Sequence, residues 1–278
     1  MIIWFSGTGN SEWVAEQLAS AQGERMVSVA EALTSGDMHL TLHDGERLGF
    51  VFPTYSWGPA PVVTEFVEKM QITGTPSFCF MVTTCGDDIG LSVEIMAKAL
   101  ARRGFTLQSA HSVQMPNNYI NMKGFDVDSD AVRTAKLNAA PCRLHQVATD
   151  IAEQKAVIDV VTGRFAWVKS KVIRPWFLKN AMSDKKFVVD TDACTHCGAC
   201  VKNCPMHNIT LTDGYDTITL KVTQKADQKK YDVTDVTRLI NMILGVVEKD
   251  DAYDFDGDGI LNVTDVTTLI NIILQTAQ

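Results

Sequence analysis

The sequence predicts an α/β protein that begins with a doubly wound parallel sheet of five strands and ends with two smaller parts. Three observations predict this architecture. Apolar runs of strand length alternate with helix-length segments up to about residue 155, four cysteines fall within residues 194–204, and one helical pattern occurs twice near the end. At 278 residues the chain exceeds a typical domain of about 150 residues. The expected parts are 1–155 (α/β domain), 156–186 (connector), 187–214 (cysteine segment) and 215–278 (tail).

The strands and crossover helices of the first part follow from its apolar periodicity. Ligands of such sheets bind beyond the carboxyl ends of the strands, so we expect functional loops after the first, third, fourth and fifth strands. The expected strands are Ile2–Phe5, Arg25–Ala30, Leu48–Phe52, Phe78–Thr83 and Leu107–Val113. The expected helices are Ser11–Ala21, Pro61–Met70, Ser92–Arg103 and Asp130–Gln154.

The loop after the first strand has the composition of a phosphate site. Ser6-Gly7-Thr8-Gly9-Asn10-Ser11 offers hydroxyl groups and backbone N–H groups at the start of a helix. No Gly-Lys-Ser/Thr follows, which excludes a P-loop, and Glu12 replaces the third glycine of the dinucleotide fingerprint. A phosphomonoester is therefore favoured, and an ordinary turn with a helix cap is the alternative.

This loop resembles that of the flavodoxins, which binds the phosphate of FMN. The resemblance implies that aromatic side chains after the third strand stack on the flavin ring, with Tyr55 slightly favoured over Trp57 and with Thr54 beside them. Surface aromatic residues are the alternative. The loop from Thr84 to Asp88 corresponds to the flavin edge, where Gly86 would let a peptide turn. Asp87 and Asp88 would lower the flavin potential there, unless they are solvent-facing turn residues.

The cysteine run Cys194-x2-Cys197-x2-Cys200-x3-Cys204-Pro205 matches the spacing of bacterial ferredoxins and predicts a 4Fe-4S cluster. A zinc site is the alternative, although zinc ribbons pair two CxxC units across a longer gap. His196 and His207 lie outside the pattern.

Together, the two patterns resemble the bacterial flavodoxin-ferredoxin fusion family over about residues 1–214, including the runs 114–119 and 184–189. The resemblance implies that Asn118 and Tyr119 also lie beside the flavin. No cysteine follows Cys204, so the count allows one cluster at most. Three possibilities remain for the fourth ligand of that cluster. It is Cys204, or it is a distant thiol, or the cluster has only three cysteine ligands.

The connector carries aromatic residues interleaved with basic ones, including Phe165, Trp167 and Trp176. We expect an interdomain connector that buries its aromatic side chains, because Pro175 interrupts the segment and its apolar residues are not cleanly on one face. A membrane-surface or partner-docking helix is the alternative.

The tail has the pattern of an EF-hand calcium loop over residues 254–265, with oxygen ligands at the usual positions. Position 12 is aspartate instead of glutamate, and in this the tail resembles a dockerin. Helix 232–244 repeats helix 262–274, but the first loop has Gln224, Ala226 and Gln228 where acids are expected. We expect Leu269, Ile270, Ile273 and Leu274 to pack against Leu239, Ile240, Ile243 and Leu244. An acidic turn without calcium is the alternative. The expected calcium ligands are Asp254, Asp256, Asp258, Ile260, Asn262 and Asp265.

These patterns predict an electron-transfer protein that passes electrons between FMN and an iron-sulfur cluster, with redox proteins as partners. The alternatives are a calcium-dependent docking protein for an extracellular cohesin-bearing partner and a flavin-dependent reductase of a small acceptor. The net charge of −8 offers no basic field for nucleic acid. The apolar N-terminus lacks the features of a signal peptide and no apolar run is long enough for a membrane span, so a cytoplasmic location is expected.

Overall fold

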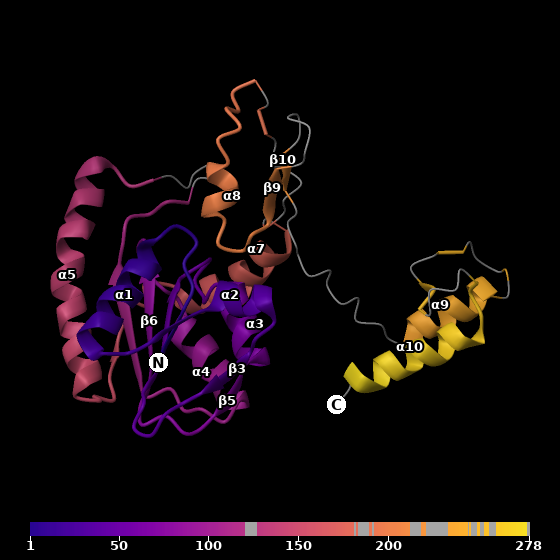
Figure 1. The fold of residues 1–278 in the computed structure, drawn as a ribbon, viewed down its shortest axis with the longest axis horizontal. Helices are drawn as coiled ribbons and strands as arrows, with labels where there is room; N and C mark the ends of the chain where they lie inside the picture. Colours follow the sequence, from indigo (N-terminus) through magenta and orange to yellow (C-terminus); the bar gives the residue numbers. More distant parts are fainter. Residues whose placement is uncertain are drawn as a thin grey trace. The chain divides into compact units, whose positions relative to one another are not determined.

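The computed structural model forms two compact units, Met1–Lys221 and Val222–Gln278, which are considered separately (Figure 1). Within each unit the helices and strands follow the apolar patterns of the sequence closely. The residues that the structure describes are 1–119, 127–180, 182, 189–190, 192–211, 218–220, 233–243, 245, 249–250, 253–255 and 260–276.

The first unit contains a parallel sheet with strand order β2-β1-β4-β6-β7-β8. Its first five strands have the flavodoxin-like order 2-1-3-4-5, in which the order reverses beside β1. The expectation of five strands was wrong, because the two-residue strand β8 pairs with β7 and is too short to produce a periodic signal. The strands are β1 (Ile2–Trp4), β2 (Met26–Ser28), β4 (Leu48–Pro53), β6 (Cys79–Cys85), β7 (Ser109–Gln114) and β8 (Ile158–Asp159).

Helices cover both faces of this sheet, with α1 (Asn10–Gln22) and α5 (Asp130–Ala152) on one face and α3 (Pro61–Lys69) and α4 (Ser92–Arg102) on the other (Figure 1). Each face has its own buried apolar cluster. Every residue of β6 is buried, as expected for a strand that is covered on both sides. The four expected crossover helices are therefore present at nearly their expected bounds.

Two local features differ from the expectation. The predicted strand at residues 25–30 ends early, because the Ser28 hydroxyl accepts a hydrogen bond from the Glu31 N–H (3.2 Å) and begins helix α2 (Val29–Ser35). A second, two-stranded parallel sheet forms between β3 (His39–Thr41) and β5 (Gln71–Thr73). Neither strand was predicted, since each has a single apolar residue, Leu40 or Ile72, between two exposed polar residues.

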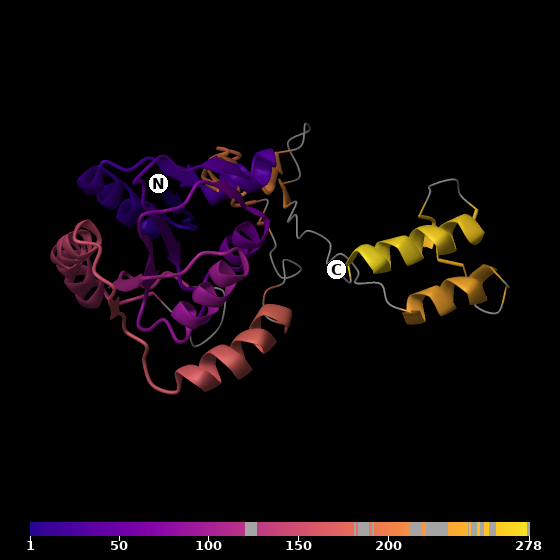
Figure 2. The ribbon, with the colours of Figure 1, turned by 90° about the horizontal axis from the view of Figure 1, so that it is seen from below.

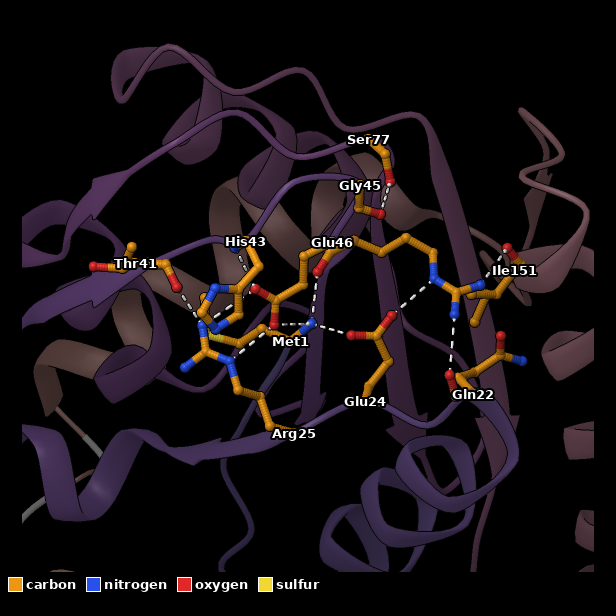
Figure 3. Close-up of polar contacts among 11 residues, drawn as sticks. Met1, Gln22, Glu24, Arg25, Thr41, His43, Gly45, Glu46, Ser77 and Ile151 are labelled. Carbon is orange, nitrogen blue, oxygen red and sulfur yellow. Dashed lines mark hydrogen bonds and ion pairs between the residues drawn. The ribbon is translucent and has the colours of Figure 1, made fainter.

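The amino end of β1 is held by a partly buried ionic cluster (Figure 3). The Met1 amino group pairs with Glu24 and with Glu46 (3.1 Å), and Arg25 and Arg47 pair with the same carboxylates at 2.9 and 2.8 Å. Burial alone would raise the pKa of Glu46, but hydrogen bonds from Arg25, a backbone N–H and the Met1 amino group outweigh it and lower this pKa to about 2. The cluster lies at the end of the sheet opposite to the expected functional loops.

The connector forms α6 (Ala166–Val168), a π-helical turn η1 (Lys169–Ile173) and α7 (Arg174–Asn180), which run on as one helix (Figure 2). Pro175 lies inside this continuous helix, directly after the π-helical turn, and because it has no N–H it removes one intrahelical hydrogen bond there. The expectation of buried aromatic side chains was wrong: Phe165, Trp167 and Trp176 are 74%, 63% and 60% exposed. Other residues of this helix make its contacts with the sheet domain.

The cysteine segment contains the short helix α8 (Ala199–Asn203) and the strands β9 (Ile209–Leu211) and β10 (Ile218–Leu220), which pair antiparallel. Strand β10 lies beyond the expected boundary at residue 214. The first unit extends to Lys221, because β10 pairs with β9 of the cysteine segment and not with a strand of the tail.

The second unit contains α9 (Val233–Ile243) and α10 (Val263–Thr276). Leu239 and Leu269 are buried in its core as expected, together with Met242, Tyr253 and Leu261. The expected packing of Ile240 was wrong, since it is 41% exposed. Leu244 and the side chains of Ile270, Ile273 and Leu274 lie outside the described residues. Among the helices described in either unit, none is long and apolar enough to cross a membrane.

Candidate functional site

The predicted loops meet at the carboxyl ends of β1, β4, β6 and β7, where the strand order reverses. Three polar contacts join loop 6–11 to strand β6 and to the loop that follows β7. Ser11 and Thr84 are both buried, so their contact belongs to the floor of the site. The contacts are Ser11 Oγ to Thr84 Oγ1 (2.8 Å), Asn10 Nδ2 to the Pro116 carbonyl (3.2 Å), and Asn118 Nδ2 to Thr8 Oγ1.

Loop 6–11 has the backbone geometry of an anion site. Gly9 has φ +97° and is the N-cap residue of α1, a conformation that favours glycine. Its N–H donates to Ser6 Oγ at 2.9 Å, which closes the loop. The first N–H groups of a helix have no partner within the helix, so those at the start of α1 are available to an anion.

Tyr55 lies directly against this loop. A Cβ atom at Gly7 would come within 2.3 Å of the Tyr55 hydroxyl oxygen, so a side chain at position 7 would displace the Tyr55 ring from its place beside the loop. Burial raises the pKa of the Tyr55 hydroxyl. The aromatic residue that the sequence favoured therefore lies beside the predicted phosphate loop.

Loop 55–59 is held by Arg174 of the connector helix, a contact that the sequence did not predict. Ser56 and Trp57 both have positive φ, at 49° and 58°. The buried guanidinium donates to the backbone carbonyls of Tyr55, Ser56 (3.4 Å) and Pro59 (2.6 Å). Burial lowers the pKa of Arg174 to about 10. The hydrogen bonds offset part of the cost of holding this loop in a strained conformation.

The neighbouring turn of the connector reaches two loops. Ser170 Oγ donates to the Trp57 carbonyl at 2.7 Å and accepts from the Leu91 N–H at 2.8 Å. Lys169 lies 5.5 Å from the centre of the Trp57 ring and pairs with Asp88 at 2.6 Å. Trp57 is thus fixed through its carbonyl and over its ring face.

The Lys169 contact changes the expected effect of the loop after β6. Asp88 is neutralised by its partner, whereas the Asp87 side chain is 86% exposed. Solvent weakens the effect of an exposed charge. Asp87 and Asp88 should therefore lower the reduction potential of a flavin bound at this loop less than the sequence suggested. Gly86 lies against Asn117, whose Cβ would be 3.2 Å from a Cβ at position 86.

The loop after β7 supplies the remaining predicted residues. Asn118 reaches Thr8, as described above, and the Tyr119 ring lies edge-on to Phe177 of α7, with 6.1 Å between ring centres. Tyr119 therefore links this loop to the connector helix. Residues 120–126 lie outside the described part of the chain.

The cysteine run has features that suit thiolate ligands. Cys194, Cys197, Cys200 and Cys204 are free thiols, and Cys197 and Cys200 are exposed. Hydrogen bonds from the Ala199 N–H and the Thr195 side chain lower the pKa of Cys197. The Asn208 N–H donates to Cys204 Sγ at 3.4 Å. Donors of this kind stabilise a coordinated thiolate.

The predicted calcium loop is described in part, because Asp256 and Asp258 lie outside the described residues. Asp265, at loop position 12, is buried and accepts the N–H groups of Phe255 (2.7 Å) and Asn262 (2.9 Å). The Asn262 side chain donates to the Ile260 carbonyl at 3.1 Å. Asp265 thereby brings the two ends of the loop together.

Comparisons with known proteins identify the cysteine segment. Residues 186–209 match the family model for a 4Fe-4S binding domain, which supports an iron-sulfur cluster in this segment. No curated protein matches the chain.

Two solved structures resemble part of the chain. The Trp repressor binding protein of Bacillus subtilis matches with 12% identity and a TM-score of 0.33 over 54% of this chain and 94% of its own. An azoreductase of Bacillus anthracis str. Sterne matches with 11% identity and a TM-score of 0.32 over 55% of this chain and 99% of its own. Similarity at this level establishes neither a shared fold nor a shared function.

Proposed function

We propose that this chain is an electron-transfer protein that binds FMN at the four loops of the sheet domain and one 4Fe-4S cluster at the cysteine run. The observation that carries this proposal is that a helix-start anion loop and a 4Fe-4S binding segment occur in one compact unit. FMN would supply one- or two-electron chemistry and the cluster one-electron transfer. Redox partner proteins would supply and accept the electrons.

The residues of the loops fit the parts of FMN. Thr8 and the N–H groups at the start of α1 would hold the phosphate, since they are neutral donors. Tyr55 would stack on the ring system, with Trp57 at its side. The complete proposed set is Ser6, Gly7, Thr8, Gly9, Asn10, Ser11, Thr54, Tyr55, Trp57, Thr84, Gly86, Asn118 and Tyr119.

Cys204 is the best candidate for the fourth cluster ligand, beside Cys194, Cys197 and Cys200. The distant thiols of Cys79 and Cys85 are disfavoured because burial raises the pKa of each to about 12, which opposes the thiolate form that a metal requires. Both lie in β6, within the sheet. Cys204 already accepts an N–H hydrogen bond in the same short segment.

The test is the absorbance spectrum of anaerobically purified protein, with flavin, iron and sulfide quantified per chain. We expect one FMN and about four iron atoms. Eight iron atoms would contradict the ligand count, and zinc in place of iron would contradict the cluster. Turnover of NAD(P)H with a quinone would show a reductase and not a carrier.

We also propose that the tail binds one calcium ion at residues 254–265. The supporting observation is the buried Asp265 carboxylate, which organises both ends of the loop. Calorimetry of the full chain should give one calcium site that D254A abolishes and D250A, outside the loop, preserves. Equal binding by both variants would contradict this site. A dockerin-type docking function of the tail would depend on this calcium site.

A further inference from the structure

The connector helix, residues 166–180, has two faces with different surroundings. Its inner face contains Ser170 and Arg174, which are 3% and 6% exposed and bind the backbone of loop 55–59. These contacts fix the orientation of the helix on the first unit. The opposite face is therefore held outward.

The outward face carries an apolar stripe, which we call the outer stripe. Its three helical residues are spaced four apart, as expected for one side of a helix that contains a π-helical turn, and its fourth residue, Phe165, directly precedes the helix. They are exposed although they are large and apolar. The outer stripe consists of Phe165, Val168, Val172 and Trp176, which are 74%, 43%, 53% and 60% exposed.

The same segment has a charge that differs from the rest of the chain. Residues 164–180 contain five basic and no acidic residues, so the remainder of the chain, with a total net charge of −8, carries −13. Lys169 and Lys171 pair with Asp88 and Glu94, and Arg174 is buried on the inner face, so Arg164 and Lys179 supply the exposed positive charge. Arg164 and Lys179 are exposed at the two ends of the outer stripe.

We propose that the outer stripe docks this protein on an anionic lipid surface. A helix with Trp and Phe on one face and basic residues around it has the composition of helices that lie in a membrane interface. The helix that carries the stripe lies along an edge of the first unit in Figure 2. A row of aromatic side chains on a convex helix can enter a deformable lipid surface, whereas a protein partner would need a groove shaped to it.

Docking through this face would have a consequence for the site. The inner face of the same helix holds loop 55–59, so the lipid surface would lie about one helix diameter, or about 10 Å, from that loop. Attachment would be peripheral, through side chains and not through a spanning segment.

The test is co-sedimentation of the full-length protein with vesicles of phosphatidylcholine alone or mixed with phosphatidylserine at 7:3. The buffer contains EGTA, so that calcium cannot link the tail to the lipid. We expect binding to the mixed vesicles, weakened by salt, and little binding to phosphatidylcholine. The F165S/W176S variant should partition at least tenfold less, and R164Q/K179Q should lose its preference for anionic lipid.

The matched control is L137S, which removes an apolar side chain of 46% exposure from α5 and should bind like the wild type. Flavin and iron contents of each variant verify that it is folded and loaded. Equal binding by F165S/W176S and the wild type would overturn the proposal. Failure of the wild type to bind mixed vesicles would also overturn it, and would assign the outer stripe to an acidic protein partner instead.

Discussion

The loops of the sheet domain and the cysteine run are organised in different ways. Loops 6–11, 55–59 and 84–88 are tied together by side chains that reach from one loop or helix to another, as Ser11 reaches Thr84 and Arg174 reaches Tyr55. In residues 194–204, two of the four thiols are exposed. The protein itself prearranges the first site, whereas the second depends on its metal for cross-linking.

The largest expected effect comes from removing one cluster ligand. C200S should lower the iron content from about four atoms per chain to less than one, because a 4Fe-4S cluster held by three thiolates is labile. FMN content should stay the same, since the loops do not depend on the cluster. Metal analysis and flavin fluorescence of the purified variant measure both.

The control for this experiment is C142S, which removes an exposed thiol on α5 and should keep all of its iron. A loss of FMN together with iron in C200S would contradict the independence of the two sites. Retention of iron in C200S would contradict the ligand assignment.

A second large effect should follow from R174M, which removes the donor that holds loop 55–59. Backbone carbonyls of Tyr55, Ser56 and Pro59 lose their partner, at a cost of about 2–4 kcal/mol in stability. FMN affinity should fall by about tenfold or more because Tyr55 and Trp57 lose their position. Titration with FMN and chemical denaturation measure the two effects.

The matched control is K171M on the same helix, whose side chain is 38% exposed and pairs with Glu94 at the surface. It should change neither quantity measurably, because exposed ion pairs contribute little. If R174M binds FMN as tightly as K171M, the arrangement of loop 55–59 does not depend on Arg174.

This difference between the sites also explains which parts were predictable. Alternating apolar segments located the strands and helices of residues 1–155 because their signal is local and periodic. Arg174 and Ser170 were not identified as site residues, since their role arises from contacts with residues more than 110 positions away. The one feature of the sequence that could have pointed to Arg174 and Ser170 was the change of composition in the connector. That change was interpreted as burial of the aromatic residues of the connector.

The tail shows the same limit. The repeated helix pattern located α9 and α10 but assigned Ile240 to the core, where Met242 lies instead. A periodic pattern shows which side of a helix is apolar only to within about one residue position. Which apolar residues of α9 enter the core is decided by the cluster that includes Tyr253. The cysteine spacing was predictable in full because a cluster fixes it chemically.

A moderate effect is expected at the opposite end of the sheet, where E46Q should lower stability without changing FMN affinity. The pKa of Glu46 is about 2 in the folded protein, below its ordinary value of 4.5. A lowered pKa stabilises the fold above the ordinary value, and this contribution is lost as the pH falls from about 4.5 to 2.

We expect E46Q to lose about 1–3 kcal/mol at neutral pH and less at pH 3, where the wild-type carboxylate is almost fully protonated in the unfolded state. Urea unfolding at pH 7, 5 and 3 measures the difference. A constant difference at all three pH values would contradict the role of the ionised carboxylate. A change in FMN affinity would contradict the separation of this cluster from the site.

The smallest effect tests a single hydroxyl in the prearranged site. Asn118 Nδ2 donates to Thr8 Oγ1, so the hydroxyl hydrogen of Thr8 could be donated to the phosphate of an FMN bound at the start of α1. T8A should weaken FMN binding about fivefold to tenfold, the effect of one hydrogen bond of about 1 kcal/mol, and T8S should restore it because serine keeps the hydroxyl.

N118A should weaken binding less than T8A, and the T8A/N118A double variant should resemble T8A, since Asn118 acts through Thr8. Calorimetric titration of the four variants with FMN measures these differences. Equal affinities of T8A and the wild type would remove Thr8 from the phosphate site and leave only the backbone N–H groups of α1 to hold the anion.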